Sequence, residues 1–362
     1  MSPYSSHSLT VSPSRSRAVC CSWWRDSAGA SAPSPIRMWP RERGRPGAHE
    51  SRLAMSEPGA SADEVDVAAV VVTFNSTRHV AALLDSLPDA FGELRYSVVV
   101  VDNDSTDGTP ELLAGRTDCR VIRASNDGYA AGINRAVNAS PPAPAILILN
   151  PDATLDPHAV PRMLEVLRRR TGAGIIAPRV REEDGSLSPT LRRGPTLGRV
   201  GGLSFTGLPV FAERIELPGQ YQTEHEVDWA VGAILLVDRR CFDGLGGLDE
   251  SFFLYSEETD FSLRARDAGW ATVYTPNAGA MHVGGGSGES ATTHTMQMLN
   301  RVRLYRRRTG GVRAWLYFGL TIVVELRRAV LGDRRSWTTL RALLRPSTRP
   351  PQLGASRALL PT

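Results

Sequence analysis

The stretch VDVAAVVVTF (residues 65–74) is an uninterrupted run of β-branched and small apolar residues that ends at a polar turn. YSVVVVD (96–102) has the same character, and HVAALLDSL (79–87), between the two, has apolar residues at helical spacing. Strands without polar alternation are typical of parallel sheets, in which helices bury both faces. The sequence therefore predicts two parallel strands joined by a covering helix.

The same alternation continues along the chain. RVIRAS (120–125) and AILILN (145–150) have strand character, a helix is expected around Ala130–Asn138, and HAVPRMLEVLRRR (158–170) predicts a further helix. This βαβαβαβα order predicts an α/β fold with a mostly parallel, helix-covered sheet and right-handed connections. In such folds ligands bind at the carboxyl ends of the strands.

Polar residues follow three of these strands. They are Thr73-Phe74-Asn75, Asp102-Asn103-Asp104 and Asn150-Pro151-Asp152. Each group alone could be a helix cap or an Asx-turn, but three at one sheet edge favour a ligand site. The chain has no GxGxxG after the first strand and no GxxxxGK[ST], which argues against a dinucleotide oxidoreductase and a P-loop NTPase.

Charge is distributed unevenly along the chain. Residues 1–55 contain eight Arg and three acids, and residues 301–362 contain fourteen Arg and two acids, which leaves 56–300 with a net charge near −13. A nucleic-acid interface would depend on the tails alone, so we expect no nucleic-acid partner. The cysteines have no metal-ligand spacing and favour a reducing compartment without structural disulfides. They are Cys20, Cys21, Cys119 and Cys241.

The N-terminal segment, residues 1–62, is rich in Ser, Pro and Arg and has no apolar period, so we expect it to be disordered. AVCCSWW (18–24) is too short to be the apolar core of a signal peptide. Met55 stands just before the polar lead-in to the first strand. We therefore expect the true start of the protein near Met55.

Six short motifs occur in a fixed order between Val67 and Gly310. They are VVVTFNS (70–76), VVVDNDSTDGT (99–109), NDGYAAGINRAV (126–137), LNPDA (149–153), VGAILLVDRRCFDGLGGLDESFFLYSEETDFSLRARDAGW (231–270) and MHVGGGS (281–287). Each motif alone is weak, but together they resemble the family 2 glycosyltransferases of GT-A fold, in particular the bacterial rhamnosyltransferase-like branch. The resemblance implies that residues 63–300 form a GT-A domain that binds a nucleotide-sugar.

The resemblance assigns Thr73, Asn75 and Asp102 to the base and ribose of the donor, and a short carboxylate can accept from two ribose hydroxyls. NDGYAAGIN (126–134) resembles the segment that closes over the nucleotide, with Gly128 allowing close backbone approach. A turn that begins a helix is the structural alternative for this segment. The other residues implied to contact the nucleotide-sugar are Asn103, Asn126, Asn134 and Asn150.

NPD (150–152) matches the family's metal-binding D-x-D motif, so Asp152 is implied to hold a divalent cation, Mg²⁺ or Mn²⁺, at the donor diphosphate. Asn150 replaces the first acid of that motif, although an amide carbonyl can still ligate a metal. His282 of MHVGGGS resembles a third contact to the metal or the diphosphate. A purely structural histidine is the alternative.

The stretch FFLYSEETDF (252–261) places Glu257, Glu258 and Asp260 within four positions. Acids in a first helical turn also complement the helix dipole, so charge alone does not assign chemistry here. YSEETDF resembles the family's Y-x-E-D-x-D, which implies that Glu258 is the general base. Glu257 and Asp260 are implied to position the acceptor or to bind a nearby Arg. Crowding of carboxylates raises the pKa of one of them toward the working range of a base.

Residues upstream of the acids resemble the acceptor side of the family's site. The resemblance assigns Trp229, Gly232 and Ala233 to the acceptor-side strand, and Asp249 with Glu250 to the loop that leads to the base. Trp faces stack on sugars but also fill cores, so both roles stay open for Trp229.

The C-terminal segment 301–362 is predicted to be a short basic helical extension. WLYFGLTIVVELRRAVLG (315–332) contains an apolar run too short to span a bilayer. With RVRLYRRR (301–308) it suits an amphipathic element on an anionic membrane surface. The alternative is a helical cap packed on the catalytic domain with a solvated Arg face.

These features predict an inverting, metal-dependent glycosyltransferase. The resemblance implies transfer of a hexose, L-rhamnose in particular, from a nucleotide-sugar such as dTDP-rhamnose to a polyprenyl-linked or cell-envelope glycan. The enzyme would be cytoplasmic and peripheral on the inner face of the membrane. The alternatives are a non-catalytic sugar-nucleotide or glycan-binding relative, and a nucleotidyltransferase. The latter would need a Gly-rich basic loop after the first strand, where TFNSTRHV (73–80) offers only Arg78.

Overall fold

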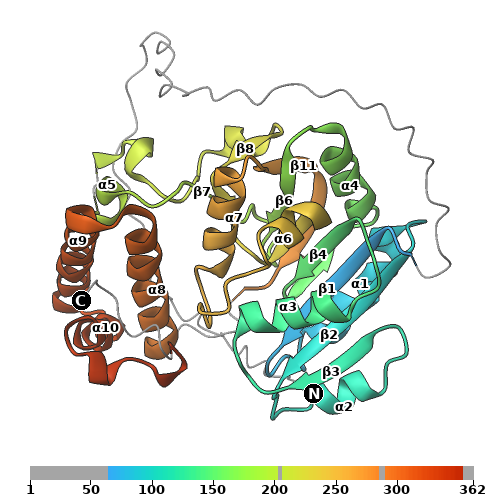
Figure 1. Cartoon of the computed structure of the whole chain (residues 1–362), viewed down its shortest axis with the longest axis horizontal. Coiled ribbons are helices and arrows are strands. Elements are labelled where there is room, and N and C mark those ends of the chain that lie inside the picture. The colour runs from blue at the N-terminus through green and yellow to red at the C-terminus, as the bar shows by residue number, and fades with distance from the viewer. Residues whose placement is uncertain (1–63, 203–205, 285–289, 354–362) are drawn as a thin grey trace, which may run out of the picture. The chain divides into compact units, whose positions relative to one another are not determined.

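The computed structural model describes residues 64–202, 206–284 and 290–353 (Figure 1). All of them belong to one compact unit, Pro58–Thr362. The prediction of disorder for residues 1–62 and the proposed start at Met55 lie outside the described residues.

The central sheet runs in the order β3, β2, β1, β4, β10, β6, β11, β5, and β8 also pairs with β11. Its strands are β1 (Val67–Thr73), β2 (Tyr96–Asn103), β3 (Arg120–Ala124), β4 (Ala145–Leu149), β5 (Ala153–Leu155), β6 (Ala173–Arg181), β8 (His225–Val227), β10 (Ile234–Asp238) and β11 (Ala271–His282). The pairs from β3 to β4 are parallel, as the buried β-branched runs predicted. Strand β10 lies antiparallel between β4 and β6, which the apolar pattern did not reveal.

Helices cover both faces of the sheet. Alternate residues of β1 belong to two separate cores: Val71 packs with α1 (Val80–Phe91) and α4 (Ala159–Arg169), and Val72 packs with α3 (Tyr129–Ala139) and residues of α6 and α7. Every residue of β1 is buried, because a strand covered on both faces has no solvent side. The α/β prediction is confirmed.

The remaining elements position the site. The helices are α2 (Thr109–Ala114), α5 (Leu197–Val200), α6 (Arg239–Gly244) and α7 (Glu257–Asp267), and a small second sheet pairs β7 (Leu191–Arg192) with β9 (Trp229–Ala230). Single 3₁₀ turns occur at η2 (Pro209–Phe211), η3 (Pro218–Tyr221) and η4 (Pro346–Thr348).

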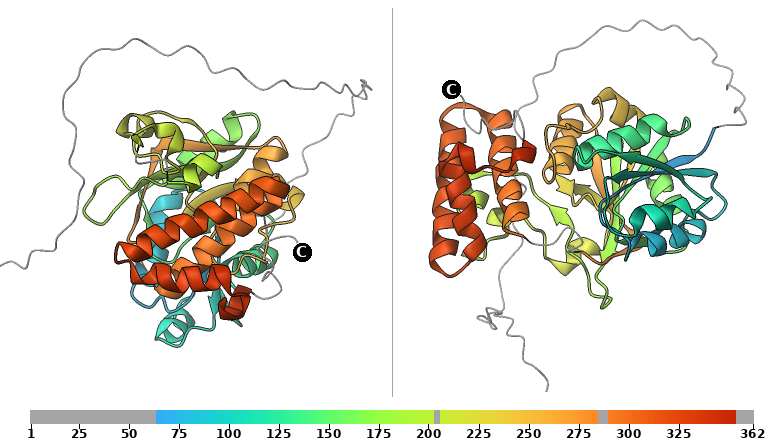
Figure 2. Two further views of the ribbon diagram at one scale, coloured as in Figure 1. Left: turned by 90° about the vertical axis from the view of Figure 1, so that its left-hand side faces the viewer. Right: turned by 90° about the horizontal axis from the view of Figure 1, so that it is seen from below.

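A group of C-terminal helices, α8 (Ala291–Thr309), α9 (Gly311–Val330) and α10 (Arg334–Leu344), pack on one another beside the α/β layers (Figures 1 and 2). Helix α8 begins with a capping box at Ser290 and continues without a break through the predicted domain boundary between 300 and 301. Among the described residues, no helix is both long and apolar enough to cross a membrane.

Candidate active site

The loops after β1 and β2 are joined by polar side chains. The side-chain oxygen of Asn75, Oδ1, accepts hydrogen bonds from the backbone N–H groups of Thr106 (2.9 Å) and Asp107 (3.3 Å), and the backbone N–H of Asn75 donates to Ser105 Oγ at 2.9 Å. Asn75 has a left-handed backbone (φ 52°), which Asn tolerates better than most residues. These contacts fix the sheet edge where Phe74 stands 52% exposed, an aromatic face available to a nucleobase that the sequence analysis did not single out.

Asp102 lies beneath this edge and is fully buried. Its carboxylate accepts from Thr73 Oγ1 at 2.9 Å and from Ser105 Oγ at 2.5 Å. The Asp102 carboxylate, which the resemblance assigned to the ribose hydroxyls, therefore accepts hydrogen bonds from within the protein, one of them from Thr73. Asp104, two residues later, is the exposed acid of this loop, with φ 61°.

The NDGYAAGIN segment packs against the loop that leads to the acidic helix. Gly128 has φ 103°, and a Cβ there would lie 2.5 Å from the carbonyl oxygen of Phe253. The Tyr129 N–H donates to the same carbonyl at 2.8 Å. The close approach anticipated at Gly128 is thus made to Phe253. Asn126 accepts from the Gly128 N–H (3.3 Å), and Asn103 donates to the Gly128 carbonyl (3.1 Å).

Asn150, Asp152 and His282 meet at one end of the sheet. Residues 150–152 link β4 to β5, and His282, the last residue of β11, is the register partner of Ala153 on β5. This pairing brings His282 Nε2 to 3.0 Å from Asp152 Oδ1 and 3.5 Å from Asn150 Nδ2. Burial alone would raise the pKa of Asp152, but the hydrogen bond and charge of His282 outweigh it and lower the pKa.

This donor set fits a divalent cation. Within the described ranges no group of three or more His, Cys, Asp or Glu side chains is placed to hold a metal ion, because the third member here is an amide. The Asp152 carboxylate and the His282 imidazole are nevertheless ligands that Mn²⁺ accepts, and diphosphate oxygens can supply the rest. Asn150 turns its amide nitrogen toward His282, and its carbonyl oxygen accepts from Tyr129. Asp152 and His282 are in contact in the structure, and their role in binding a metal stays a prediction.

The acids stand at the start of α7, after a strained turn. Tyr255 (φ 69°) and Ser256 (φ 77°) both have left-handed backbones, which is unusual for consecutive non-glycine residues. Glu257 is 5% exposed, and one carboxylate oxygen of each glutamate, Glu257 and Glu258, is buried without a hydrogen-bond partner. Burial raises the pKa of both, and the neighbouring carboxylate raises that of Glu257 further. An unpartnered buried carboxylate of raised pKa is suited to accept a proton.

Tyr129 connects the acids with Asn150, Asp152 and His282, which we call the Asn150 group. Its hydroxyl donates to Asn150 Oδ1 at 2.9 Å. Burial raises the pKa of the phenol well above its ordinary value, and the charges of Glu257, Glu258 and Asp152 raise it further, so it stays a donor. The three acids therefore lie within electrostatic range of one phenol. Tyr129 was quoted in a motif but not assigned a role, since nothing in the sequence said which way it points.

Gly232 and Arg192 adjoin Glu258. A Cβ on Gly232 would lie 3.1 Å from the Glu258 Cβ, so the glycine leaves room for the glutamate. Arg192, on β7, donates to the carbonyl of Leu191 at 3.0 Å and forms no ion pair among the described residues. Its charge favours the ionised form of Glu258, which lowers the pKa that burial raises. The sequence analysis missed Arg192, because it lies in a stretch that matches no motif.

Trp229 belongs to the core rather than to an open sugar platform. It is 8% exposed, its Nε1–H donates to the Arg193 carbonyl at 3.2 Å, and the Arg192 guanidinium carbon lies 5.9 Å from its ring centroid. Of the two roles left open for this residue, the structural one agrees with its burial. Ala233, just before β10 of the central sheet, is also buried, and its carbonyl accepts from the Asn150 N–H.

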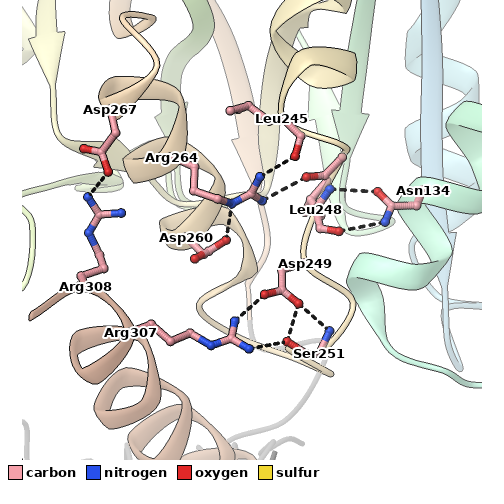
Figure 3. Close-up of polar contacts among 11 residues, drawn as sticks. Asn134, Leu245, Leu248, Asp249, Ser251, Asp260, Arg264, Asp267, Arg307 and Arg308 are labelled. Atoms are coloured by element: carbon pink, nitrogen blue, oxygen red, sulfur yellow. Dashed lines mark hydrogen bonds and ion pairs between the residues drawn. The ribbon is translucent and has the colours of Figure 1, made fainter. Parts of the chain in front are cut away.

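Other predicted site residues hold the loop between α6 and α7 (Figure 3). Asp260 accepts from Arg264 Nε at 2.6 Å, so of its two predicted roles the structure shows binding to a local Arg. Asp249 pairs with Arg307 of α8. Asn134 donates to the Leu248 carbonyl (2.9 Å) and to Glu250 Oε1 (2.9 Å), which uses both amide hydrogens. These side chains shape the path to the acids.

A hollow of about 830 Å³ includes Arg192 of β7 in its lining. Its lining includes His225, Asp228, Trp270 and Ala271, at the end of α7 and the start of β11. His282 is at the opposite end of β11, twelve residues long. The hollow is therefore distinct from the Asn150 group.

Comparisons with known proteins place the chain among the glycosyltransferases. A family model described as glycosyl transferase family 2 matches residues 68–229. An N-acetylglucosaminyl-diphospho-decaprenol L-rhamnosyltransferase of Mycobacterium tuberculosis is 34% identical over 235 residues, 59% of this chain and 74% of the relative. The low-salt glycan biosynthesis hexosyltransferase Agl10 of Haloferax volcanii is 29% identical over 207 residues, 56% of this chain and 62% of the relative.

Among solved structures, GalNAc-T7 with UDP, GalNAc and Mn²⁺ is similar with a TM-score of 0.51 and 14% identity, over 78% of this chain and 55% of that chain. This likeness concerns the fold alone and confirms the GT-A arrangement. The family assignment rests on the rhamnosyltransferase relative, because this chain is 34% identical to it over 74% of its length. The chain is therefore a glycosyltransferase and belongs to glycosyl transferase family 2.

Proposed function

We propose that this glycosyltransferase moves a hexose, L-rhamnose from dTDP-rhamnose, onto a polyprenyl-linked glycan acceptor, with inversion at the anomeric carbon. Two features of the site carry the proposed reaction. The Tyr129 hydroxyl donates to Asn150, and Glu258, whose charge acts on the same phenol, has one buried carboxylate oxygen without a hydrogen-bond partner. The donor and acceptor rest on the 34% identical relative, whose name describes L-rhamnosyl transfer to a diphospho-decaprenol-linked sugar. The enzyme would work on the cytoplasmic face of the membrane.

In the proposed reaction an acceptor hydroxyl attacks the anomeric carbon, and Glu258 takes its proton. The bond from that carbon to the diphosphate oxygen breaks, and the nucleoside diphosphate leaves with the bonding electrons. Asp152 and His282 would hold a divalent cation. When bound, the cation neutralises charge on the diphosphate. Tyr129 fixes the Asn150 carbonyl, and Phe74, with the loops held by Asn75 and Asp102, offers a surface to the nucleotide.

A donor screen tests the specificity. The full chain is incubated with Mn²⁺, a short-chain N-acetylglucosaminyl diphosphate lipid and, in turn, dTDP-rhamnose, UDP-glucose, UDP-galactose or GDP-mannose. Acceptor-dependent release of nucleoside diphosphate from dTDP-rhamnose alone supports the proposal. Release from another donor refutes the rhamnosyl assignment while keeping glycosyl transfer.

Variants of the acids test the base. Glu258→Gln keeps the shape of the side chain but cannot accept the proton, so kcat should fall by roughly 10²–10⁴. Glu258→Asp should restore part of it, and Glu257→Gln should act mainly on the acceptor KM. Near-normal turnover in Glu258→Gln would end the assignment. If the unaltered protein binds the donor but transfers no sugar, the alternative of a non-catalytic sugar-nucleotide-binding protein is favoured instead.

A further inference from the structure

Helix α9 has its polar and apolar faces reversed. The residues it buries include Thr321 and Glu325, together with Ala314, Tyr317 and Ala329. Its exposed side is largely aliphatic and aromatic. The exposed side chains are Val312 (75%), Trp315 (53%), Leu316 (51%), Val323 (61%), Leu326 (45%) and Val330 (70%). At helical spacing these six form one continuous stripe, which in an ordinary surface helix would face the core.

A buried polar network fixes this orientation. Glu325 has no solvent exposure, and its two carboxylate oxygens accept from His294 of α8 (3.0 Å) and from Arg328 (2.9 Å). Rotating α9 to bury the stripe would remove Glu325 from these partners, and breaking a buried pair of this kind is strongly destabilising. The outward display of the apolar stripe is therefore built into the packing of α8 against α9.

The neighbouring helix α10 also has exposed apolar side chains. Trp337 and Leu344 of α10 are 54% and 61% exposed, and α10 packs against α9. We call the stripe together with these two residues the α9 surface. Figure 2, left, looks onto α9 and α10, which lie in front of the sheet in that view. Exposed apolar areas of this extent mark interaction sites in soluble proteins.

Arginines accompany the apolar side chains. Arg313 and Arg327 on α9 are exposed, as are Arg334 and Arg341 on α10 and Arg345 at its C-cap. The acids of these two helices and their caps are Glu325, which is buried, and Asp333, which pairs with Arg335. Aromatic and aliphatic side chains flanked by arginine suit an anionic lipid surface. A second copy fits less well, because a symmetric contact would bring these arginines against one another.

We propose that the α9 surface docks on an anionic lipid bilayer, with α9 lying in the interface. Only the purpose of this docking, access to a lipid-linked acceptor, rests on the proposed function. The same helical layer contacts the catalytic loop: Asn300 of α8 donates to the Leu254 carbonyl at 2.9 Å, and Arg303 donates to the Ser251 carbonyl. Docking through α9 therefore holds the acidic helix at a fixed place relative to the membrane.

Vesicle sedimentation of the full chain tests this directly. The vesicles are phosphatidylcholine alone or phosphatidylcholine mixed with phosphatidylglycerol, without donor or acceptor. The unaltered protein should bind the anionic vesicles, and Leu316→Ser with Val323→Ser should weaken binding at least about tenfold, since two inserted side chains are lost. Arg313→Gln with Arg327→Gln should weaken it by about fivefold per arginine. Leu217→Ser, which removes an exposed leucine outside the α9 surface, should change nothing.

The variants change exposed residues, so their melting temperatures should stay within about 2 °C of the unaltered protein. Unchanged vesicle binding by Leu316→Ser with Val323→Ser overturns the proposal. So does a solution dimer that this variant dissociates, because the occupant would then be a second copy. Transfer to the short-chain acceptor in the absence of vesicles is measured separately. If the protein transfers sugar but binds no vesicles, only the docking proposal is refuted. If it binds vesicles but transfers no sugar, only the proposed function is refuted.

Discussion

The side-chain amide of Asn300 donates to the carbonyl oxygen of Tyr255 at 3.1 Å, so the C-terminal helix α8 holds the strained turn that begins the acidic helix α7. Asn300 is 1% exposed and also donates to the Leu254 carbonyl. A left-handed turn of two non-glycine residues persists only where its surroundings impose it. Helix α8 thus supports the turn that precedes the acids, and a truncation at 300 would cut α8 beside this contact.

Asn300→Ala should loosen that turn. Two buried carbonyls lose a donor, which costs about 1–3 kcal/mol of unfolding free energy, and kcat should fall about tenfold while the donor KM changes little, since the acids move and the nucleotide loops do not. Thermal melting and steady-state kinetics measure both effects. Asn138→Ala, an exposed asparagine on α3, is the control. A lower melting temperature with unchanged kcat would mean that Asn300 stabilises the protein without positioning the acids.

Gly128→Ala should both destabilise and slow the enzyme. The new Cβ would meet the Phe253 carbonyl oxygen at 2.5 Å, in addition to the strain of φ 103°, and Phe253 leads into the acidic turn. Gly185 provides a matched control, because it has φ 80° and nothing within 4 Å of its Cβ position. Backbone strain alone costs about 1–3 kcal/mol and should be common to both variants. Equal losses of stability and no loss of kcat in Gly128→Ala would show that the Phe253 contact has no influence on the site.

The Asn150 group predicts a defined metal response. Asn150→Asp adds a carboxylate beside Asp152 and should lower the Mn²⁺ concentration needed for half-maximal turnover, whereas Asp152→Asn should raise it sharply. Tyr129 can still donate to an aspartate at 150, so its hydrogen bond is kept. Calorimetric titration with Mn²⁺ and nucleoside diphosphate measures the affinities. Asp156→Asn, which alters a neighbouring carboxylate paired with Arg181, is the control. Full turnover in excess EDTA would rule out a cation at this site.

The sequence predicted the parallel half of the sheet well, because buried strands such as Val67–Thr73 contain little but β-branched and small apolar residues. It could not predict that β10 inserts antiparallel between β4 and β6, since a fully buried strand reads the same in either direction.

Within the site, motif order brought together Asp152 and His282, which lie 130 residues apart. Sequence could not decide which motif residues face a ligand and which hold a loop. Asp102 and Asn134 have ligand-binding chemistry, yet their hydrogen bonds are made within the protein. The burial that decides this comes from tertiary packing. Arg192 and Tyr129 were overlooked for the same reason, since their importance lies in what they approach.

Arg192 should set the pH dependence of the reaction. Burial raises the pKa of Glu258, and the positive charge of Arg192 opposes that effect. Burial also lowers the pKa of Arg192, to about 10, which leaves the guanidinium charged at neutral pH. A general base works only when ionised, so activity is lost as the pH falls through the pKa of Glu258. Removing the charge in Arg192→Gln raises that pKa further and should move the acidic limb of the kcat/KM profile to higher pH.

The free energy of unfolding should change in the opposite direction to activity over the same pH range. Because the folded protein binds a proton on Glu258 more tightly than the unfolded chain does, unfolding free energy decreases as the pH rises from the ordinary glutamate pKa to the raised one. In Arg192→Gln this decrease should extend to higher pH. Arg192→Lys retains the charge and should restore most of the profile, while Arg193→Gln, whose guanidinium donates to the Ala212 carbonyl, should leave it unmoved. An acidic limb that stays in place in Arg192→Gln would show that Arg192 supports the β7–β9 ladder without acting on Glu258.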